Sequence, residues 1–280
     1  MDIKALWDEL ETSLTPLLLE FRSRLESLEI SQKPDHTLLT AADIAVQEYI
    51  VARILAHDPG ASIVAEEAGD QQGGAATSQR IWIIDPIDGT AEFVRPDRRE
   101  YCSVVCLLED RQPVAALVVA PQIGTGGTAV SMRVVGPGSS IEVNGEPRPG
   151  ISMSAPLRAS VTRSSTAERP WERLMADAGF ELKTRTTSQT LDMVRTCVDL
   201  SQETGTALAP FSLFYREAQK VWDGAAGMCL AQTAGLRVCD GHGRDRHVIN
   251  LDLRAVEPTF ASTLVAAPAV VDQFLAWSSG

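Results

Sequence analysis

The sequence predicts a mixed α/β (α+β) fold. Stretches with apolar side chains every three or four residues, typical of amphipathic helices, alternate with short apolar runs typical of buried strands. No repeat of 20–50 residues occurs in the sequence, so a solenoid or propeller is not indicated. With 280 residues, 44% hydrophobic and 22% charged, the chain has an ordinary globular composition and is long enough for one large domain or two packed halves.

The N-terminal half predicts two helices followed by strands. A stripe that begins at Leu6 predicts a helix over residues 3 to about 30, with Pro16 as a point of potential interruption. A second helix is predicted over 41–57, where Thr40 is the N-cap and Asp43 closes a capping box. Strands are predicted at residues 62–65, 81–84, 101–108 and 113–120, the last two as an antiparallel pair, followed by short hairpins over 124–150.

The pattern changes near residue 154. A strand is expected at Val161 and a helix over residues 170–178, ended by Gly179. Further elements are predicted in this order: a helix at 191–200, an extended segment at 207–214, a helix at 224–234, strands at 236–239 and 262–266, and a helix at 270–277. We therefore expect an α+β half over residues 1–150 and a second α/β half over residues 151–280.

Charge and cysteine content exclude several classes of protein. The net charge of −12 disfavours a nucleic-acid binder, because phosphate backbones are neutralised by Lys and Arg. The five cysteines form no CxxC pair, which indicates neither a disulfide framework nor a zinc site. No apolar run has the length of a membrane span, and the N-terminal residues lack the features of a signal peptide. We expect a cytoplasmic protein that binds no nucleic-acid polymer and no membrane.

The segment WIIDPIDGT, residues 82–90, is the candidate site. Asp85 and Asp88 follow a short apolar strand, and two aspartates so placed need a counter-charge if they are buried. Gly89 permits close approach of the backbone to a ligand, and the helix that could begin after it would offer free amides to a phosphate. Asp-Pro and Asp-Gly pairs are also common turn signals, so this segment alone leaves a site and an ordinary turn open.

Other carboxylates add weight to the site. Glu66 and Glu67 end the strand before the candidate segment, and Asp223 lies in the apolar stretch VWDGAAG. Hard divalent cations prefer such oxygen ligands. Asp223 could instead be simply the N-cap of the helix predicted after it. Asp35 and Asp43 supply further carboxylates on the N-terminal side.

Four segments together resemble the inositol monophosphatase superfamily of magnesium-dependent, lithium-sensitive phosphatases. They are, in order, DHTLLTAAD (35–43), AEE (65–67), WIIDPIDGTAEF (82–93) and VWDGAAG (221–227). The resemblance implies a layered αβαβα sandwich, two or three bound Mg²⁺ ions, and hydrolysis of a small phosphate ester by an activated water. It also implies inhibition by lithium and calcium, and relatives are often dimers, so a homodimer is the assembly to test.

The resemblance assigns roles to individual residues. The implied metal ligands are Glu66, Asp85, the carbonyl of Ile87, Asp88 and Asp223. Glu67 falls beside them as a further carboxylate of the catalytic group. Asp43 and Thr90 match the pair that holds and orients the attacking water, and the amides of Gly89 and Thr90, next to Asp88, are expected to bind the substrate phosphate.

The substrate is less well defined. Glu92 and Phe93 resemble the adenosine 3′,5′-bisphosphate nucleotidase branch more than the inositol monophosphatase branch. The stretch TSQT (187–190) replaces the glycine-containing turn of the family, which puts a standard nucleotide or inositol substrate in doubt and makes Ser188 a candidate substrate contact.

Two further residues bear on the choice of substrate. Asp192 is acidic where nucleotidase relatives often carry lysine, which would disfavour a second phosphate. Arg163 is a candidate substrate contact and equally a surface residue. A nucleotide phosphate and a sugar or inositol phosphate both stay open, and the alternative of another class is a catalytically silent relative that binds a metal or metabolite.

Overall fold

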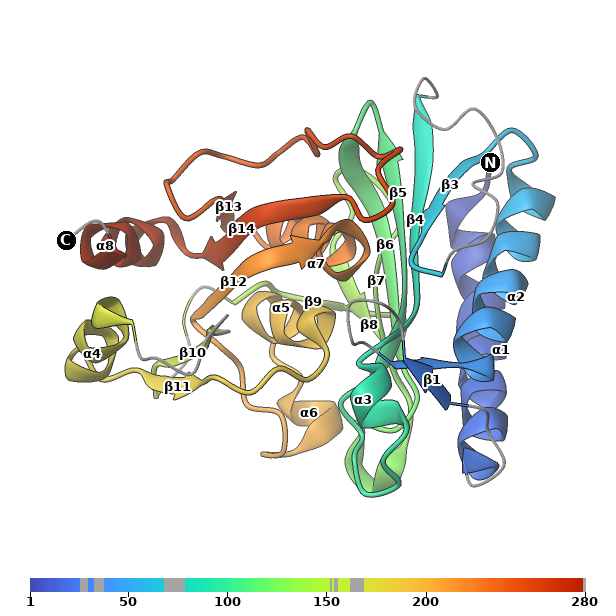
Figure 1. The fold of residues 1–280 in the computed structure, drawn as a ribbon, viewed down its shortest axis with the longest axis horizontal. Coiled ribbons are helices and arrows are strands. Elements are labelled where there is room, and N and C mark those ends of the chain that lie inside the picture. The colour runs from blue at the N-terminus through green and yellow to red at the C-terminus, as the bar shows by residue number, and fades with distance from the viewer. Residues whose placement is uncertain are drawn as a thin grey trace.

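The computed structural model describes residues 1–25, 30–32, 38–67, 79–151, 153, 156–161 and 169–278. Its elements form helical and sheet layers in the order α-β-α-β-α (Figure 1). Three buried apolar clusters fill the spaces between the successive layers. The predicted α/β (α+β) fold and its αβαβα layering are confirmed.

The first layer consists of two helices, α1 (Ile3–Ser23) and α2 (Ala41–His57). Helix α1 continues through Pro16, where an interruption was predicted, and it ends earlier than the predicted residue 30. Helix α2 has the predicted bounds and the predicted capping box at Thr40. Within the described parts of the chain, no helix combines the length and the apolar character needed to cross a membrane.

The second layer is a seven-stranded sheet in sequential order, β3-β4-β5-β6-β7-β8-β9. Its first pair of strands is parallel and the others are antiparallel. The strands are β3 (Ser62–Ala65), β4 (Arg80–Asp88), β5 (Cys102–Glu109), β6 (Gln112–Ala120), β7 (Val130–Val134), β8 (Ile141–Val143) and β9 (Glu146–Arg148). The predicted hairpins are confirmed, and β4 extends beyond its predicted end at residue 84 to include the aspartates of the candidate site.

Two buried tryptophans join the first helix to this sheet. The rings of Trp7 in α1 and Trp82 in β4 meet edge to face with centroids 5.8 Å apart. Trp7 Nε1 donates to the carbonyl of Val134 at 3.1 Å, and Trp82 Nε1 donates to the Asp58 carboxylate at 3.1 Å. Because both indole N–H groups have partners, the rings are buried without leaving a polar atom unsatisfied.

The fourth layer is a five-stranded sheet with the order β11-β10-β12-β14-β13. Its strands are β10 (Arg158–Val161), β11 (Glu181–Lys183), β12 (Leu213–Lys220), β13 (Arg237–Cys239) and β14 (Thr259–Ala266). The predicted extended segment at 207–214 is wrong except for its last two residues: the strand β12 runs on to Lys220. The charged and polar side chains in its second half obscured the strand pattern, because β-branched and aromatic residues are the ones that indicate a strand in a sequence.

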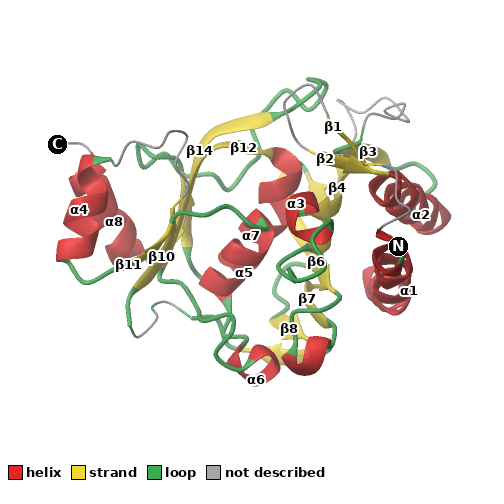
Figure 2. Cartoon of the chain, turned by 60° about the horizontal axis from the view of Figure 1, so that its bottom comes forward, coloured by secondary structure: helices red, strands yellow, loops and turns green. Residues whose placement is uncertain are grey.

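Two helices, α4 (Pro170–Asp177) and α8 (Pro268–Ser278), cover the outer face of this second sheet (Figure 2). Shorter elements complete the described fold: β1 (Ile30–Gln32), β2 (Leu38–Thr40), α3 (Thr90–Phe93), α6 (Ser201–Thr204) and the 3₁₀ turn η2 (Thr125–Gly127). The first sheet ends at Arg148 and the second begins at Arg158, but one buried cluster takes side chains from both sheets. The division of the chain into halves at residue 150 stays a prediction.

The middle layer lies between the two sheets and consists of α5 (Gln189–Cys197) and α7 (Val221–Thr233) (Figure 2). Helix α7 begins three residues before its predicted start, with Lys220 as its N-cap, so the interpretation of Asp223 as an N-cap is wrong. The two helices approach closely at Gly227, where an added Cβ would lie 2.6 Å from Met193 Sδ. The absence of a side chain at Gly227 therefore sets the distance between α5 and α7.

We predict that Gly227→Ala destabilises the protein by about 1–3 kcal/mol, the usual cost of inserting a methyl group into a packed core. The control is Gly136→Ala, because an added Cβ there would meet nothing within 4 Å. Urea denaturation followed by tryptophan fluorescence measures both variants. Equal midpoints for the two variants would contradict the packing argument.

Candidate metal and phosphate site

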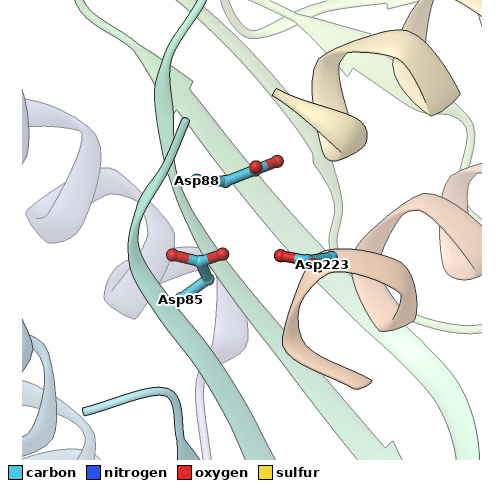
Figure 3. Close-up of side chains that lie close together, drawn as sticks. All are labelled: Asp85, Asp88 and Asp223. Carbon is cyan, nitrogen blue, oxygen red and sulfur yellow. The ribbon is translucent and has the colours of Figure 1, made fainter. Parts of the chain in front are cut away.

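Three buried or half-buried carboxylates converge between the first sheet and the middle helices. Asp85 and Asp88 come from β4 and Asp223 from the first turn of α7 (Figure 3). Each offers one oxygen, and these oxygens all lie within 4.8 Å of one another. Oxygens at such separations can share one cation, so the turn interpretation of Asp85 and Asp88 is insufficient.

An irregularity in β4 brings its two aspartates to one face of the sheet. Asp85 pairs with Val104 and Asp88 pairs with Cys102 in the neighbouring strand, so two residues of β4 stand opposite the single residue Ser103. Side chains three positions apart in a regular strand point to opposite faces, and one extra residue reverses that relation. Pro86 lies inside this bulge, where the missing N–H removes no regular ladder bond.

Glu66 and Glu67 follow the strand next to β4. The Glu66 amide donates to the carbonyl of Ile84 at 3.1 Å, which places Glu66 beside Asp85. Glu67 is buried, and its backbone exchanges two hydrogen bonds of 3.0 Å with the side-chain amide of Gln47 in α2. The ligand role of Glu66 and the catalytic role of Glu67 stay predictions.

The metal-free cluster is electrostatically strained. Burial raises the pKa of Asp85 well above its usual value, and the charges of Glu66, Asp88 and Asp223 raise it further. Burial likewise raises the pKa of Asp223 well above the usual value, again with a contribution from its acidic neighbours. Burial raises the pKa of Asp88 to about 6, although hydrogen bonds from Ser188 and the residues after it act in the opposite direction.

The unsatisfied oxygens of Asp85 match a divalent cation. Both are buried, and neither has a hydrogen-bond partner among the described residues. A buried carboxylate without donors requires a positive charge or a proton. Because the neighbouring groups are hard oxygen ligands from Asp88 and Asp223, Mg²⁺ suits the position better than zinc or a softer metal.

Asp43 and Thr90 meet at the edge of this cluster. Thr90 Oγ1 lies 3.4 Å from Asp43 Oδ1 and 3.1 Å from the carbonyl oxygen of Ile87, a predicted metal ligand. The other oxygen of Asp43, Oδ2, accepts hydrogen bonds from the amide and hydroxyl of Thr40 at 2.8 and 2.6 Å. The helix cap and the contact with Thr90 therefore use different oxygens, so Asp43 supports both.

A short turn presents backbone amides beside the carboxylates. Gly89 precedes α3 with φ of +93°, a backbone conformation that favours glycine, and an added Cβ would lie 3.0 Å from the carbonyl of Glu100. The first helical bonds run from Glu92 and Phe93 to the Gly89 carbonyl, so the amide of Thr90 precedes them. Phosphate binding by the Gly89 and Thr90 amides stays a prediction.

Arg22 anchors that turn, a role that was not predicted from the sequence. Its guanidinium donates to the carbonyls of Phe93 at 2.5 Å and Arg95 at 2.8 Å, and also bonds the Arg98 carbonyl. It also lies over the Tyr101 ring, 4.7 Å from the centroid. Arg22 is part of the apolar stripe of α1 by position, and only the fold shows that it reaches the end of α3.

The start of α5 holds the other side of Asp88. Ser188 Oγ and the Thr190 amide each donate to Asp88 Oδ2 at 2.7 Å, and the Gln189 amide donates to Oδ1 at 3.2 Å. Gln189 Nε2 also donates to Asp223 Oδ2 at 2.7 Å. The altered turn at residues 187–190 therefore orients two carboxylates, which was not predicted. Ser188 is fully buried, and its contact with substrate stays a prediction.

Asp192 does not present a free negative charge. It is 3% exposed, and Lys183 donates to its two oxygens at 2.6 and 2.8 Å. Ser160 and Arg195 also bond the carboxylate. Because this charge is neutralised inside the fold, Asp192 gives no argument against a second phosphate. Two predicted positions, Asp35 and Arg163, lie outside the described residues.

Comparison with known proteins identifies the family of the chain. The chain matches the inositol monophosphatase family over residues 9–274. It is 28% identical to Nus factor SuhB of Xylella fastidiosa over 240 residues, which cover 82% of this chain and 78% of the relative. It is 27% identical to the 3′(2′),5′-bisphosphate nucleotidase CysQ of Salmonella typhimurium over 218 residues, which cover 78% and 82% of the two chains.

Among solved structures, an IMPase/NADP phosphatase complexed with Mg²⁺ and phosphate has the same fold, with a TM-score of 0.74. The match covers 99% of this chain and 96% of the other at 17% identity. The family match spans nearly the whole chain, and the chain therefore belongs to the inositol monophosphatase family. It is an enzyme of the phosphatase class.

We predict that Mg²⁺ stabilises the protein strongly at pH 7.5 and weakly at pH 5. The folded, metal-free protein retains protons on the cluster up to a pKa of about 6 at Asp88, whereas the unfolded chain releases them near pH 4. Stability of the metal-free protein therefore falls as the pH rises through this window. Magnesium reverses the loss, by about 2.7 kcal/mol at 100 times its dissociation constant.

Thermal melts with EDTA and with Mg²⁺ at the two pH values measure this effect. The control is Asp177→Asn, which removes an exposed aspartate on α4 and should leave the magnesium effect intact. Asp85→Asn should abolish most of it. An equal magnesium shift at both pH values would contradict the electrostatic account.

Proposed function

We propose that the protein is a magnesium-dependent phosphomonoesterase that hydrolyses a small phosphorylated metabolite through an activated water. The observation that carries this proposal is the convergence of Asp85, Asp88 and Asp223 around the unsatisfied oxygens of Asp85. A site with this much buried negative charge cannot bind a phosphate dianion by itself. Two or three Mg²⁺ ions, held by these residues with Glu66 and the Ile87 carbonyl, would make the local charge of the site positive.

When bound, magnesium neutralises phosphate oxygens, acidifies a water and stabilises the leaving alkoxide. The protein's own groups position the attacking water and the phosphate. Thr90 Oγ1 donates a hydrogen bond to Asp43 Oδ1, which leaves the lone pairs of the hydroxyl free to accept one from the attacking water, and this pair orients that water. The amides of Gly89 and Thr90 bind the phosphate from the side of α3.

The substrate proposed is a nucleotide phosphate or a sugar or inositol phosphate. Similarity to the bisphosphate nucleotidase CysQ supports the first, and the family supports the second. Glu92, which suggested the nucleotidase branch, is 3% exposed and forms an ion pair with Arg185. Its role is therefore compatible with either substrate.

A catalytically silent binding protein is the second candidate function. Similarity to a relative named Nus factor SuhB favours it, because that name describes no hydrolysis. The ordered pair of Asp43 and Thr90 favours the enzyme, since a protein that only binds does not need a group that positions water.

The first functional prediction is magnesium-dependent phosphate release. Asp88→Asn and Asp223→Asn should each lower kcat/KM by about 100-fold or more, because each removes a charge that holds the metal. Asp177→Asn is the matched control and should keep full activity. The assay is malachite-green detection over inositol phosphates, sugar phosphates, histidinol phosphate and adenosine 3′,5′-bisphosphate. Lithium and calcium should inhibit, and full turnover by both site variants would refute the assignment.

The second functional prediction separates water positioning from metal binding. Thr90→Ala should lower kcat by about 10²–10⁴-fold, the usual contribution of a positioned proton-transfer group. Thr90→Ser keeps the hydroxyl and should retain most of the activity. Magnesium affinity, measured by calorimetry, should be similar in both variants. A Thr90→Ala enzyme with normal kcat would show that the hydroxyl does not act on the water.

A further inference from the structure

Arg216 lies on the face of β12 that is directed toward the candidate site. Phe214, two residues earlier, belongs to the buried cluster that includes α5 and α7. Leu213 and Tyr215 belong instead to the cluster beneath α4 and α8. Because side chains alternate along a strand, Arg216 shares the face of Phe214, between the second sheet and the helix that carries Asp223.

The guanidinium of Arg216 is poorly satisfied. In the part of the chain that the structure describes, its buried Nε has no hydrogen-bond partner, and the guanidinium makes one hydrogen bond, a 3.4 Å contact from Nη1 to the hydroxyl of Thr186. Among the described residues, no carboxylate forms an ion pair with it within 4.0 Å. Burial lowers its pKa, while the charges of Asp223 and Asp88 act in the opposite direction.

Metal binding changes the surroundings of this arginine. A cation bound by Asp223 and Asp88 would neutralise their negative charges. These charges would then no longer balance the positive charge of Arg216. A half-buried guanidinium without a counter-ion is costly, and an anion that accepts bonds from its planar fork removes that cost. Asp192 offers no such anion, because Lys183 and Arg195 already pair with it.

We propose that Arg216 is a specificity residue that binds an anionic group on the alcohol part of the substrate. The inference rests on the proposed phosphatase function of the same site. It defines the substrate class as phosphate monoesters whose leaving alcohol also carries a carboxylate or a second phosphate. The guanidinium bonds the segment of Thr186 and is within electrostatic reach of Asp223 and Asp88.

The test uses pairs of substrates that differ only in the anion. Adenosine 3′,5′-bisphosphate is compared with adenosine 3′-monophosphate, and 3-phosphoglycerate with glycerol 3-phosphate. In at least one pair, the substrate with the additional anion should have a kcat/KM about 10- to 100-fold higher than that of the substrate without it, as expected for a charge-assisted hydrogen bond. Arg216→Gln should remove this preference by raising KM for the substrate with the additional anion, with kcat preserved for the substrate that lacks it.

Three further variants test whether the effect comes from the charge of Arg216. Arg216→Lys should retain part of the preference, and Arg216→Glu should reverse it. Arg254→Gln replaces an exposed arginine of the loop before β14 and should leave the ratio unchanged. Melting temperatures identify any variant that fails to fold, in which case the Lys and Glu variants decide the outcome.

Binding of the same pairs, measured by calorimetry with Ca²⁺ in place of Mg²⁺, separates this inference from the proposed function. No phosphate release from any ester would refute the phosphatase proposal, yet a binding preference lost in Arg216→Gln would still support the anion site. An unchanged ratio in Arg216→Gln would overturn the inference. So would a variant that alters only magnesium affinity, because Arg216 would then be a counter-ion of the carboxylates alone.

Discussion

Mutual repulsion among the buried carboxylates is the constraint on which the rest of the site depends. Asp85, Asp88 and Asp223 lie too close together to be ionised without a counter-charge, and the two oxygens of Asp85 meet no donor in the described part of the chain. The fold holds them there because they come from different elements, a bulged strand and the first turn of a helix. The packing of these elements therefore offsets the repulsion among the carboxylates and holds them in position for a cation.

Each of the surrounding elements restricts the position or orientation of one or more of these carboxylates. The bulge in β4 turns both of its aspartates to one face, and the start of α5 fixes the orientation of Asp88 through three hydrogen bonds. Gly227 lets α5 and α7 pack closely, and this packing keeps Gln189 at the start of α5 within hydrogen-bonding distance of Asp223 in α7. The site is preorganised by rigid secondary structure and by contacts beyond the ligands themselves.

Much of this could be predicted from the sequence because the signals are local. The capping box at Thr40, the helix 41–57 and the hairpin strands follow from spacing and turn residues. The carboxylates and Thr90 follow from short motifs and a family resemblance. The bulge was not predictable, because pairing of β4 with β5 is a property of the sheet. The pairing of Asp192 with Lys183 joins residues 9 positions apart, and the longest-range bond of Arg22 beside α3 joins residues 76 positions apart; neither separation carries a periodic signal.

The most direct test of the central claim is the position of a divalent cation in a crystal. Crystals soaked in Mn²⁺, an anomalously scattering substitute for Mg²⁺, should give strong anomalous peaks bounded by Asp85, Asp88 and Asp223. A further peak beside Glu66 would extend the site to the full proposed ligand set. Absence of any peak between the three aspartates at saturating Mn²⁺ and neutral pH would contradict the account, because their buried charge would then be balanced by protons alone.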